Sequence, residues 1–276
     1  MIKVLVDSAS DYTMSEINEK GLLFVPLQIE MNGKTYLDEV EIDKQHFYEL
    51  MIDSKEFYKT SQPSPQRYVT LFEEIKENKD SLICLCLSSQ LSGTYQSAIL
   101  AKSMVEYDSI YVIDTLSATC GIRLLTEMIL KWIDDDVNID TIVSRIENMK
   151  SRVRIVAGID TLEYLARGGR ISKSAALLGG FANIKPIIAI ENGKVEMIGK
   201  ARGINKATHF IQDWMERYEM DLQYPVYSIY SYGVENVERL EERLNLTCQR
   251  IQLGSTIGVH IGPGAFGLCF IGKDCV

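Results

Sequence analysis

The sequence lacks the short motifs of several common enzyme classes. No G-x-S-x-G segment is present, which argues against an α/β-hydrolase. The chain also has no G-x-x-x-x-G-K-[ST] phosphate loop and no H-E-x-x-H segment, and no G-x-G-x-x-G follows its first apolar run. We therefore expect a binding protein without catalytic residues of its own, one that hydrolyses neither esters nor ATP.

The sequence is also poor in metal ligands. It has three histidines and six cysteines, and no pair of cysteines has zinc-ligand spacing with histidines nearby. We expect no metal and no cofactor, and we interpret the cysteines as small hydrophobic residues in a reducing compartment. Cys84 and Cys86 stand one residue apart in an apolar run, which predicts burial on one face of a strand.

Long hydrophobic and basic runs are missing as well. No window reaches the ~18 apolar residues that span a membrane, and the N-terminus MIKVLVDSAS lacks the features of a signal peptide. These absences predict a cytoplasmic protein with no integral membrane segment. The net charge of -9 argues against nucleic acid as a partner, so any anionic ligand must be held by local hydrogen bonds.

What is present is an alternation of short apolar runs with helical patterns. The runs at 2–6, 81–87 and 109–113 predict parallel strands. Helices are predicted at about 43–53, 65–78, 93–105, 118–134, 138–150, 205–218 and 234–244. The predicted fold class is α/β, in which an N-terminal parallel-sheet α/β domain (residues 1–150) packs on a second, mixed-sheet α+β domain (residues 151–276).

The second half of the chain has a different sequence pattern. Asn192-Gly193 lies between two apolar segments and predicts a β-hairpin. The charge run at 134–136 resembles a linker or a solvated helix end. The segment 254–267 is rich in glycine, which predicts tight turns or a surface that another part of the molecule approaches closely.

Hydroxyl side chains concentrate where the predicted strands of the first half end. They occur in residues 7–10, 59–62, 88–94 and 114–117. Ligands of open α/β sheets bind at this edge, and hydroxyls beside helix N-termini can hold a carboxylate or phosphate without a cation. For any one loop, helix capping explains the hydroxyls at least as well. Ser92-Gly93-Thr94 is the sharpest candidate, because its glycine allows close approach to the backbone.

Three further parts of the sequence could contribute to a site that binds an anion. His260 lies in the glycine-rich segment and could supply a hydrogen bond or charge, or could be purely structural. Residues 165–172 and 200–203 are small basic spots that could contact an acidic partner or a nucleotide, or could be ordinary surface.

Seven segments, in order along the chain, together resemble the DegV family. They are Val6–Asp11, Thr60–Ser64, Leu91–Ala98, Gly168–Ser172, Lys185–Ile188, Lys200–Gly203 and His260–Gly264. The resemblance implies a two-domain α/β protein that encloses a long-chain fatty acid such as palmitate. It also implies a partner fatty acid kinase that phosphorylates the carboxyl group, so that the acyl phosphate enters phospholipid synthesis.

The resemblance also implies roles for individual residues. Thr60 and Ser92 would bind the carboxylate, and Ser61, Thr94, Arg170 and His260 would lie near them. Arg202 would belong to the face that meets the kinase. Two alternatives stay open: a dihydroxyacetone-kinase-like subunit that binds a small carbonyl substrate through His260, and a structural or regulatory module.

Overall fold

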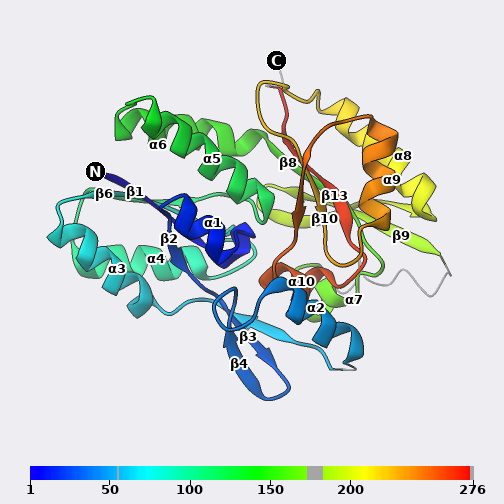
Figure 1. Cartoon of the computed structure of the whole chain (residues 1–276), viewed down its shortest axis with the longest axis horizontal. Coiled ribbons are helices and arrows are strands. Elements are labelled where there is room, and N and C mark those ends of the chain that lie inside the picture. The colour runs from blue at the N-terminus through cyan, green and yellow to red at the C-terminus, as the bar shows by residue number, and fades with distance from the viewer. Residues whose placement is uncertain (55, 173–182, 274–276) are drawn as a thin grey trace.

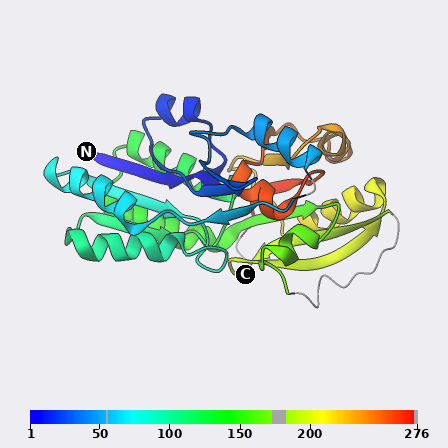
Figure 2. The same ribbon diagram turned by 90° about the horizontal axis from the view of Figure 1, so that it is seen from below.

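The structure is a computed structural model that describes residues 1–54, 56–172 and 183–273. A parallel sheet occupies the end of the long axis that holds the N-terminus, and a mixed sheet occupies the other end (Figure 1, Figure 2). Helices flank both sheets. The predicted fold class is therefore confirmed.

The first sheet has four parallel strands in the order β2-β1-β6-β7. They are β1 (Ile2–Asp7), β2 (Leu23–Val25), β6 (Ser81–Cys86) and β7 (Ile110–Asp114). On β6, Leu82 and Cys84 pack into one hydrophobic cluster, whereas Ile83 and Leu85 pack into another. This strand is buried on both faces, which explains its uninterrupted apolar run.

Helices cover both faces of this sheet. Tyr68 and Ala98 belong to the cluster on one face, and Leu124 and Ile142 belong to the cluster on the other. The helices concerned are α3 (Pro65–Glu77) and α4 (Thr94–Val105) on the first face, and α1 (Met14–Glu19), α5 (Cys120–Asp134) and α6 (Ile139–Met149) on the second. The bounds of α3, α4, α5 and α6 lie close to the predicted ones, whereas α1 was not predicted from the sequence. The charge run at 134–136 is the exposed end of α5.

A small antiparallel sheet, in the order β4-β3-β5, has no counterpart in the sequence prediction. It consists of β3 (Gln28–Met31), β4 (Lys34–Leu37) and β5 (Lys59–Ser61), and α2 (Lys44–Asp53) packs against it. These strands are too short for a periodic pattern to reveal them. Thr60 therefore lies within a strand of this sheet, and its expected place at the edge of the parallel sheet was wrong.

The second sheet has six strands in the order β10-β9-β8-β13-β11-β12. β11 and β12 pair in parallel and the other neighbours pair antiparallel, so the sheet is mixed as predicted. The strands are β8 (Val153–Gly158), β9 (Ile184–Glu191), β10 (Lys194–Arg202), β11 (Tyr227–Tyr230), β12 (Gln249–Gln252) and β13 (Phe266–Ile271). The helices α8 (Ile204–Arg217) and α9 (Glu235–Leu244) pack on one face, and the short α7 (Glu163–Arg167) follows β8.

Two local predictions in this half can be compared with the structure. Asn192 and Gly193 both have positive φ, 49° and 80°, and they form the predicted turn between β9 and β10. The glycine-rich segment contains a helix, α10 (Ser255–Ile261), where mainly turns were expected. The expected close approach is confirmed, because a Cβ on Gly258 would lie 2.5 Å from the ring of Phe47 on α2.

One hydrophobic cluster reaches across both sheets. It includes Val4 and Ile83 of the parallel sheet together with Ile155 and Cys269 of the mixed sheet. All six strands of the mixed sheet follow residue 150. The division into domains at residue 150 stays a prediction, since the shared cluster joins the two parts.

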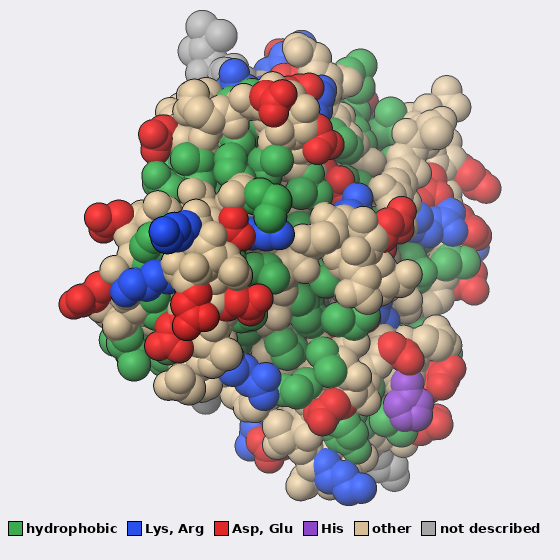
Figure 3. Space-filling model, turned by 60° about the vertical axis from the view of Figure 1, so that its left-hand side comes forward, with side chains coloured by type: hydrophobic (Ala, Val, Ile, Leu, Met, Phe, Trp, Pro, Cys, Tyr) green, Lys and Arg blue, Asp and Glu red, His purple; other side chains and the backbone are tan. Residues whose placement is uncertain are grey.

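The surface mixes charges of both signs. On the face drawn in Figure 3, lysine and arginine side chains are scattered among acidic ones and form no continuous basic patch. Within residues 1–54, 56–172 and 183–273, no helix is long and apolar enough to cross a membrane. Cys84 and Cys86 are fully buried, with their sulfur atoms 3.7 Å apart on one face of β6, as predicted.

Candidate functional site

A narrow cavity lies between the carboxyl edge of the parallel sheet and one face of the mixed sheet. It contains about 770 Å³ of atom-free space including its mouth, of which about 80 Å³ admits the centre of a water-sized sphere. Because so little of this space is wide enough for a water molecule, the cavity is a thin channel. Most lining side chains are aliphatic, and they include Leu27, Leu87, Leu91, Ile155, Leu165, Ile188, Ile190, Val195, Ile229, Leu253, Ile257 and Ile261.

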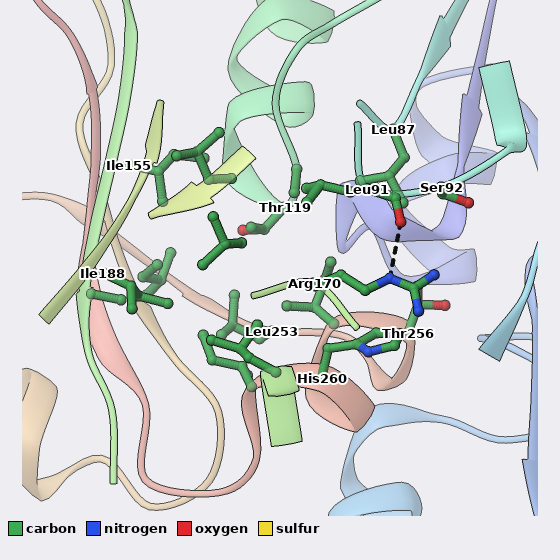
Figure 4. A pocket seen from close by; sticks show the side chains of 18 of the residues that line it. Leu87, Leu91, Ser92, Thr119, Ile155, Arg170, Ile188, Leu253, Thr256 and His260 are labelled. Atoms are coloured by element: carbon green, nitrogen blue, oxygen red, sulfur yellow. Dashed lines mark hydrogen bonds between the residues drawn. The ribbon is translucent and has the colours of Figure 1, made fainter. Parts of the chain in front are cut away.

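Polar side chains gather at one end of this channel. Figure 4 shows Ser92, Arg170 and His260 on one side and Ile155 and Ile188 on the opposite side. The cavity thus has a polar head, built by Thr60, Ser92, Arg170 and His260, and a mainly apolar remainder. These four residues come from four separate parts of the chain, and each was predicted as a ligand-binding residue.

Thr60 and His260 form the central contact of the head. The Thr60 hydroxyl and His260 Nε2 are 2.7 Å apart, although 200 residues separate them in sequence. Thr60 reaches this point from β5, and His260 from the last turn of α10. The packing of α10 against α2 and β3 therefore decides whether the two side chains meet.

The environment keeps His260 neutral. Burial, with the positive charge of Arg170 as a second cause, lowers the pKa of His260 to about 4. Its Nδ1 atom is buried and has no hydrogen-bond partner among the described residues. Gly168 leaves room for this atom, because a Cβ at that position would lie 2.3 Å from Nδ1.

Among the residues that the structure describes, no acidic side chain pairs with the positive charge of Arg170. Its Nε donates to the Leu91 carbonyl at 3.0 Å, the bond drawn dashed in Figure 4, and its Nη1 donates to the Gly168 carbonyl. Burial lowers the pKa of Arg170, as expected for a cation drawn away from water. A cation held only by carbonyl dipoles remains available to an anion in the channel.

Ser92 lies in the loop that leads into α4. Its hydroxyl is 2.9 Å from the Thr94 hydroxyl and accepts from the Thr94 amide at 3.3 Å. Thr94 is fully buried and does not line the channel, so it orients Ser92. Gly93 does allow a close approach, but the group beside it is Gln62, whose Oε1 would lie 1.8 Å from a Cβ.

Two predicted residues lie away from the channel. Ser61 follows Thr60 on β5, so it points to the other face of the strand, where its exposed hydroxyl donates to Gln28 Oε1 at 3.1 Å. Arg202 is the exposed last residue of β10. Neither residue lines this cavity.

Three of the four hydroxyl-rich segments, residues 7–10, 88–94 and 114–117, do meet at the edge of the parallel sheet, as predicted, whereas residues 59–61 form β5. Ser88 N donates to the Ser117 carbonyl at 2.9 Å, and Thr119 N donates to the Ala9 carbonyl at 2.7 Å. Most of these hydroxyls serve the protein itself. The Ser88 hydroxyl, for example, donates to the Gly193 carbonyl at 2.7 Å, which ties the two sheets together.

Two lining hydroxyls were not singled out from the sequence. Thr119 precedes α5, and Thr256 lies in the first turn of α10. The Thr256 hydroxyl donates to Asp38 Oδ2 at 2.6 Å, and burial raises the pKa of that carboxyl group. The presence of Thr256 in the glycine-rich segment was the only signal that could have marked it.

The described residues contain no group of three or more histidine, cysteine or acidic side chains arranged to hold a metal ion. The head instead offers hydroxyls, a neutral imidazole and a guanidinium. This donor set suits a carboxylate, which accepts hydrogen bonds at both oxygens.

Comparison with known proteins gives consistent results. The DegV family model matches residues 1–273. A DegV domain-containing protein of Caldanaerobacter subterraneus subsp. tengcongensis is 35% identical over 275 residues, which are 98% of each chain. A DegV family protein from Thermus thermophilus, solved for its fatty acid binding, has a TM-score of 0.88 at 28% identity over 99% of each chain. A stearic acid-binding protein from Eubacterium ventriosum is also 28% identical, with a TM-score of 0.88 over 99% of each chain.

Proposed function

Because this chain belongs to the DegV family, we propose that it binds one long-chain fatty acid, with the carboxylate at Thr60 and Ser92 and the acyl tail in the apolar channel. The observation that carries this proposal is the shape and lining of the cavity. It is thin and mostly aliphatic, and its guanidinium and imidazole groups lie at one end. The two solved relatives bind fatty acids, which supports the same ligand class here.

The tail supplies most of the affinity in this proposal. Burying about a dozen methylene groups contributes roughly 10 kcal/mol at about 0.8 kcal/mol each. Association costs reduce this gain. The head then needs only to fix the position of the carboxylate, and Thr60 and Ser92 hydroxyls with the charge of Arg170 are sufficient for a monoanion.

His260 has a positioning role at the head. As a neutral ring it can hold the Thr60 hydroxyl without adding a second positive charge. Thr94 orients Ser92 from the other side. The predicted role of Ser61 near the carboxylate has no support from its orientation.

We further propose that the protein presents the carboxylate to a partner fatty acid kinase, with Arg202 on the face that meets it. The chain carries no phosphate loop, which favours a phosphoryl donor brought by another protein. The exposed position of Arg202 at the end of β10 is compatible with this role. The alternative ligand, a small carbonyl compound, would need a more polar pocket than this aliphatic one.

The first experiment identifies the ligand directly. Protein expressed in bacteria and purified should release about one fatty acid per chain on denaturation and extraction, as measured by mass spectrometry. An extract without fatty acid, or one dominated by sugars or nucleotides, would contradict the proposal.

Substitutions then test the head. Thr60→Ala and Ser92→Ala each remove a hydrogen bond to a charged group, worth roughly 1.5–3 kcal/mol, and should weaken palmitate binding by about one to two decades in a calorimetric titration. Ser61→Ala is the matched control, because its hydroxyl is the next one along β5 and points away from the channel. Equal affinities for Thr60→Ala and Ser61→Ala would place the head elsewhere.

The proposed kinase role is tested by a separate assay, which measures acyl phosphate formation. With a candidate kinase present, acyl phosphate formation should fall further than palmitate affinity in the Thr60→Ala, Ser92→Ala double variant, because a loosely held carboxylate seldom adopts attacking geometry. Arg202→Ala should slow transfer while leaving palmitate affinity unchanged. A defect of the same size in both assays would argue against presentation.

A further inference from the structure

A second hollow, separate from the channel, lies along the second half of α6, beside α5, on which α6 packs (Figure 1). It has a volume of about 420 Å³ and shares no lining residue with the channel. Its walls also include the short 3₁₀ helix η2 (Lys150–Arg152) and the loop before β11, so both halves of the chain contribute to it. We call it the α5–α6 hollow, and it is lined by Trp132, Arg145, Asn148, Met149, Arg152 and Tyr224.

Two aromatic rings and two arginines line this hollow in pairs. The guanidinium carbon of Arg145 lies 5.3 Å from the centre of the Trp132 ring, and that of Arg152 lies 5.6 Å from the centre of the Tyr224 ring. Both distances fall within the ~6 Å over which a cation is attracted to an aromatic face. These contacts hold the arginines against the rings, and the hollow therefore has two aromatic walls with a guanidinium beside each.

The two arginines differ in the charge that they offer to a ligand. Arg152 pairs with Asp221 at 2.8 Å, and its Nε donates to the Gly272 carbonyl at 2.9 Å, so its charge is offset within the protein. Arg145 is exposed, and its guanidinium has no hydrogen bond or ion pair within the described part of the chain. No aspartate or glutamate is among the described lining residues. Arg145 therefore brings one positive charge that is available to an anion.

The stacked arrangement leaves the N–H groups of Arg145 available. A guanidinium over a ring uses its flat face for that contact, whereas its N–H donors lie along its edge. Two such donors match the two oxygens of a carboxylate. Asn148 stands three residues further along the same face of α6 and adds an amide donor. The hollow thus combines donors for an anion with the apolar surface of Trp132, Met149 and Tyr224.

We propose that the α5–α6 hollow binds a small aromatic carboxylate, whose carboxylate contacts Arg145 and Asn148 and whose ring packs against Trp132 and Tyr224. The single available charge matches a monoanion, whereas the several charges of a nucleotide would need more cations. The apolar surface is limited to the two rings and Met149, which suits an aromatic ring and not a long acyl tail. The site is independent of the proposed fatty acid site, because the two share no lining residue.

The two tryptophans of the chain allow the ligand to be located directly. Protein labelled with 5-fluorotryptophan gives one ¹⁹F signal from Trp132, which lines the hollow, and one from Trp214, which is buried in the cluster of the mixed sheet. The spectrum of Trp132→Phe assigns the two signals. Titration with 2-naphthoate should shift the Trp132 signal saturably and leave the Trp214 signal in place, and the shift gives a dissociation constant.

Matched ligands test the chemistry of the site. The amide 2-naphthamide has the same rings without the charge, and decahydro-2-naphthoate has the same charge on a saturated skeleton. We expect each to bind about fivefold more weakly than 2-naphthoate, because each loses one of the two kinds of contact. Equal binding of the amide would contradict the role of Arg145, and equal binding of the saturated acid would contradict that of the rings. Either result would overturn the proposal.

Substitutions test the individual residues. Arg145→Gln should weaken 2-naphthoate binding by about fivefold, the size of one exposed ion pair, and Tyr224→Leu should weaken it by a similar factor through loss of a ring contact. Arg239→Gln is the matched control, because it removes an exposed arginine from α9, which lines neither the hollow nor the channel. An unchanged constant in Arg145→Gln, an equal loss in Arg239→Gln, or the absence of a saturable Trp132 shift in wild type would each overturn the site.

Discussion

At the scale of single residues, His260 shows how burial sets the protonation state of a side chain. A histidine in water titrates near neutral pH, but here burial and Arg170 lower its pKa from 6.5 to about 4. The ring is therefore an uncharged hydrogen-bonding group in the working protein. The contact with Thr60 holds a hydroxyl in place without placing a second full charge beside the proposed carboxylate position.

This shift predicts a pH-dependent contribution to stability. Between pH 6.5 and 4 the unfolded chain binds a proton at His260 that the folded protein excludes, so this contribution is complete above pH 6.5 and is lost as the pH falls toward 4. The stability difference between wild type and His260→Gln should shrink by up to about 3 kcal/mol over that range. Urea denaturation of ligand-free protein at several pH values measures this.

The difference between the two proteins is the informative quantity. Burial raises the pKa of Asp7 to about 7 and of Asp11 to about 6, and these groups make wild type less stable as the pH rises from about 4. Subtracting the free energy of unfolding of His260→Gln from that of wild type cancels the contribution of these two groups, because both proteins retain both carboxyl groups. Ser61→Ala, which changes no titrating group, should differ from wild type by a constant amount, and a constant difference for His260→Gln too would contradict the shift.

At the scale of elements, α10 connects the core to the head. The Thr256 hydroxyl and amide both donate to Asp38 Oδ2, at 2.6 and 3.1 Å, and the Gly254 amide donates to Asp11 Oδ1 at 2.8 Å. These bonds fix the start of the helix to the N-terminal half of the chain. Its other end carries His260 to Thr60.

Removal of one of these bonds should therefore be costly. Thr256→Val keeps the shape of the side chain but leaves a buried carboxyl group with one donor fewer, and should lower the free energy of unfolding by about 1–3 kcal/mol. Thr70→Val, at an exposed position of α3, removes a hydroxyl that donates to the Gln66 carbonyl and should change stability by less than about 0.5 kcal/mol. Equal midpoints for the two variants in urea would show that α10 is held by other contacts.

At the scale of the whole molecule, the two sheets share one core. The cluster that contains Val4 and Ile83 also contains Ile155 and Cys269, and the channel lies between the two sheets. A ligand in the channel would contact both parts of the chain. Shared burial of this kind favours unfolding in a single step.

Two tryptophans provide separate reporters for this prediction. Trp132 on α5 packs against the shared cluster, and Trp214 on α8 is buried in the cluster of the mixed sheet. Trp214→Phe and Trp132→Phe leave one reporter each, and in either variant the fluorescence midpoint in urea should coincide with that of the far-ultraviolet circular dichroism. A fluorescence midpoint that departs from the dichroism midpoint within one variant would show that the parts on either side of residue 150 unfold independently.

The sequence by itself determined much of the secondary structure and the position of the hydroxyl-rich edge. Helical spacing, apolar runs and Asn192-Gly193 are local signals, and each was enough to predict its element. The segments that resemble DegV proteins also identified Thr60, Ser92, Arg170 and His260, which the structure brings to one end of the channel. Short strands such as β5 and the helix α10 were missed, because three residues show no period and glycine obscures a helical pattern.

The tertiary structure alone decided which side chains face the channel. Thr60 and Ser61 are neighbours of similar chemistry, and only the pairing of β5 with β3 turns the first inward and the second outward. The same holds for aliphatic residues, since Ile155 lines the channel and Val156 packs on the opposite face of β8. Local sequence cannot encode these outcomes, because they depend on contacts between segments as far apart as Thr60 and His260, whose meeting is set by the packing of the whole chain.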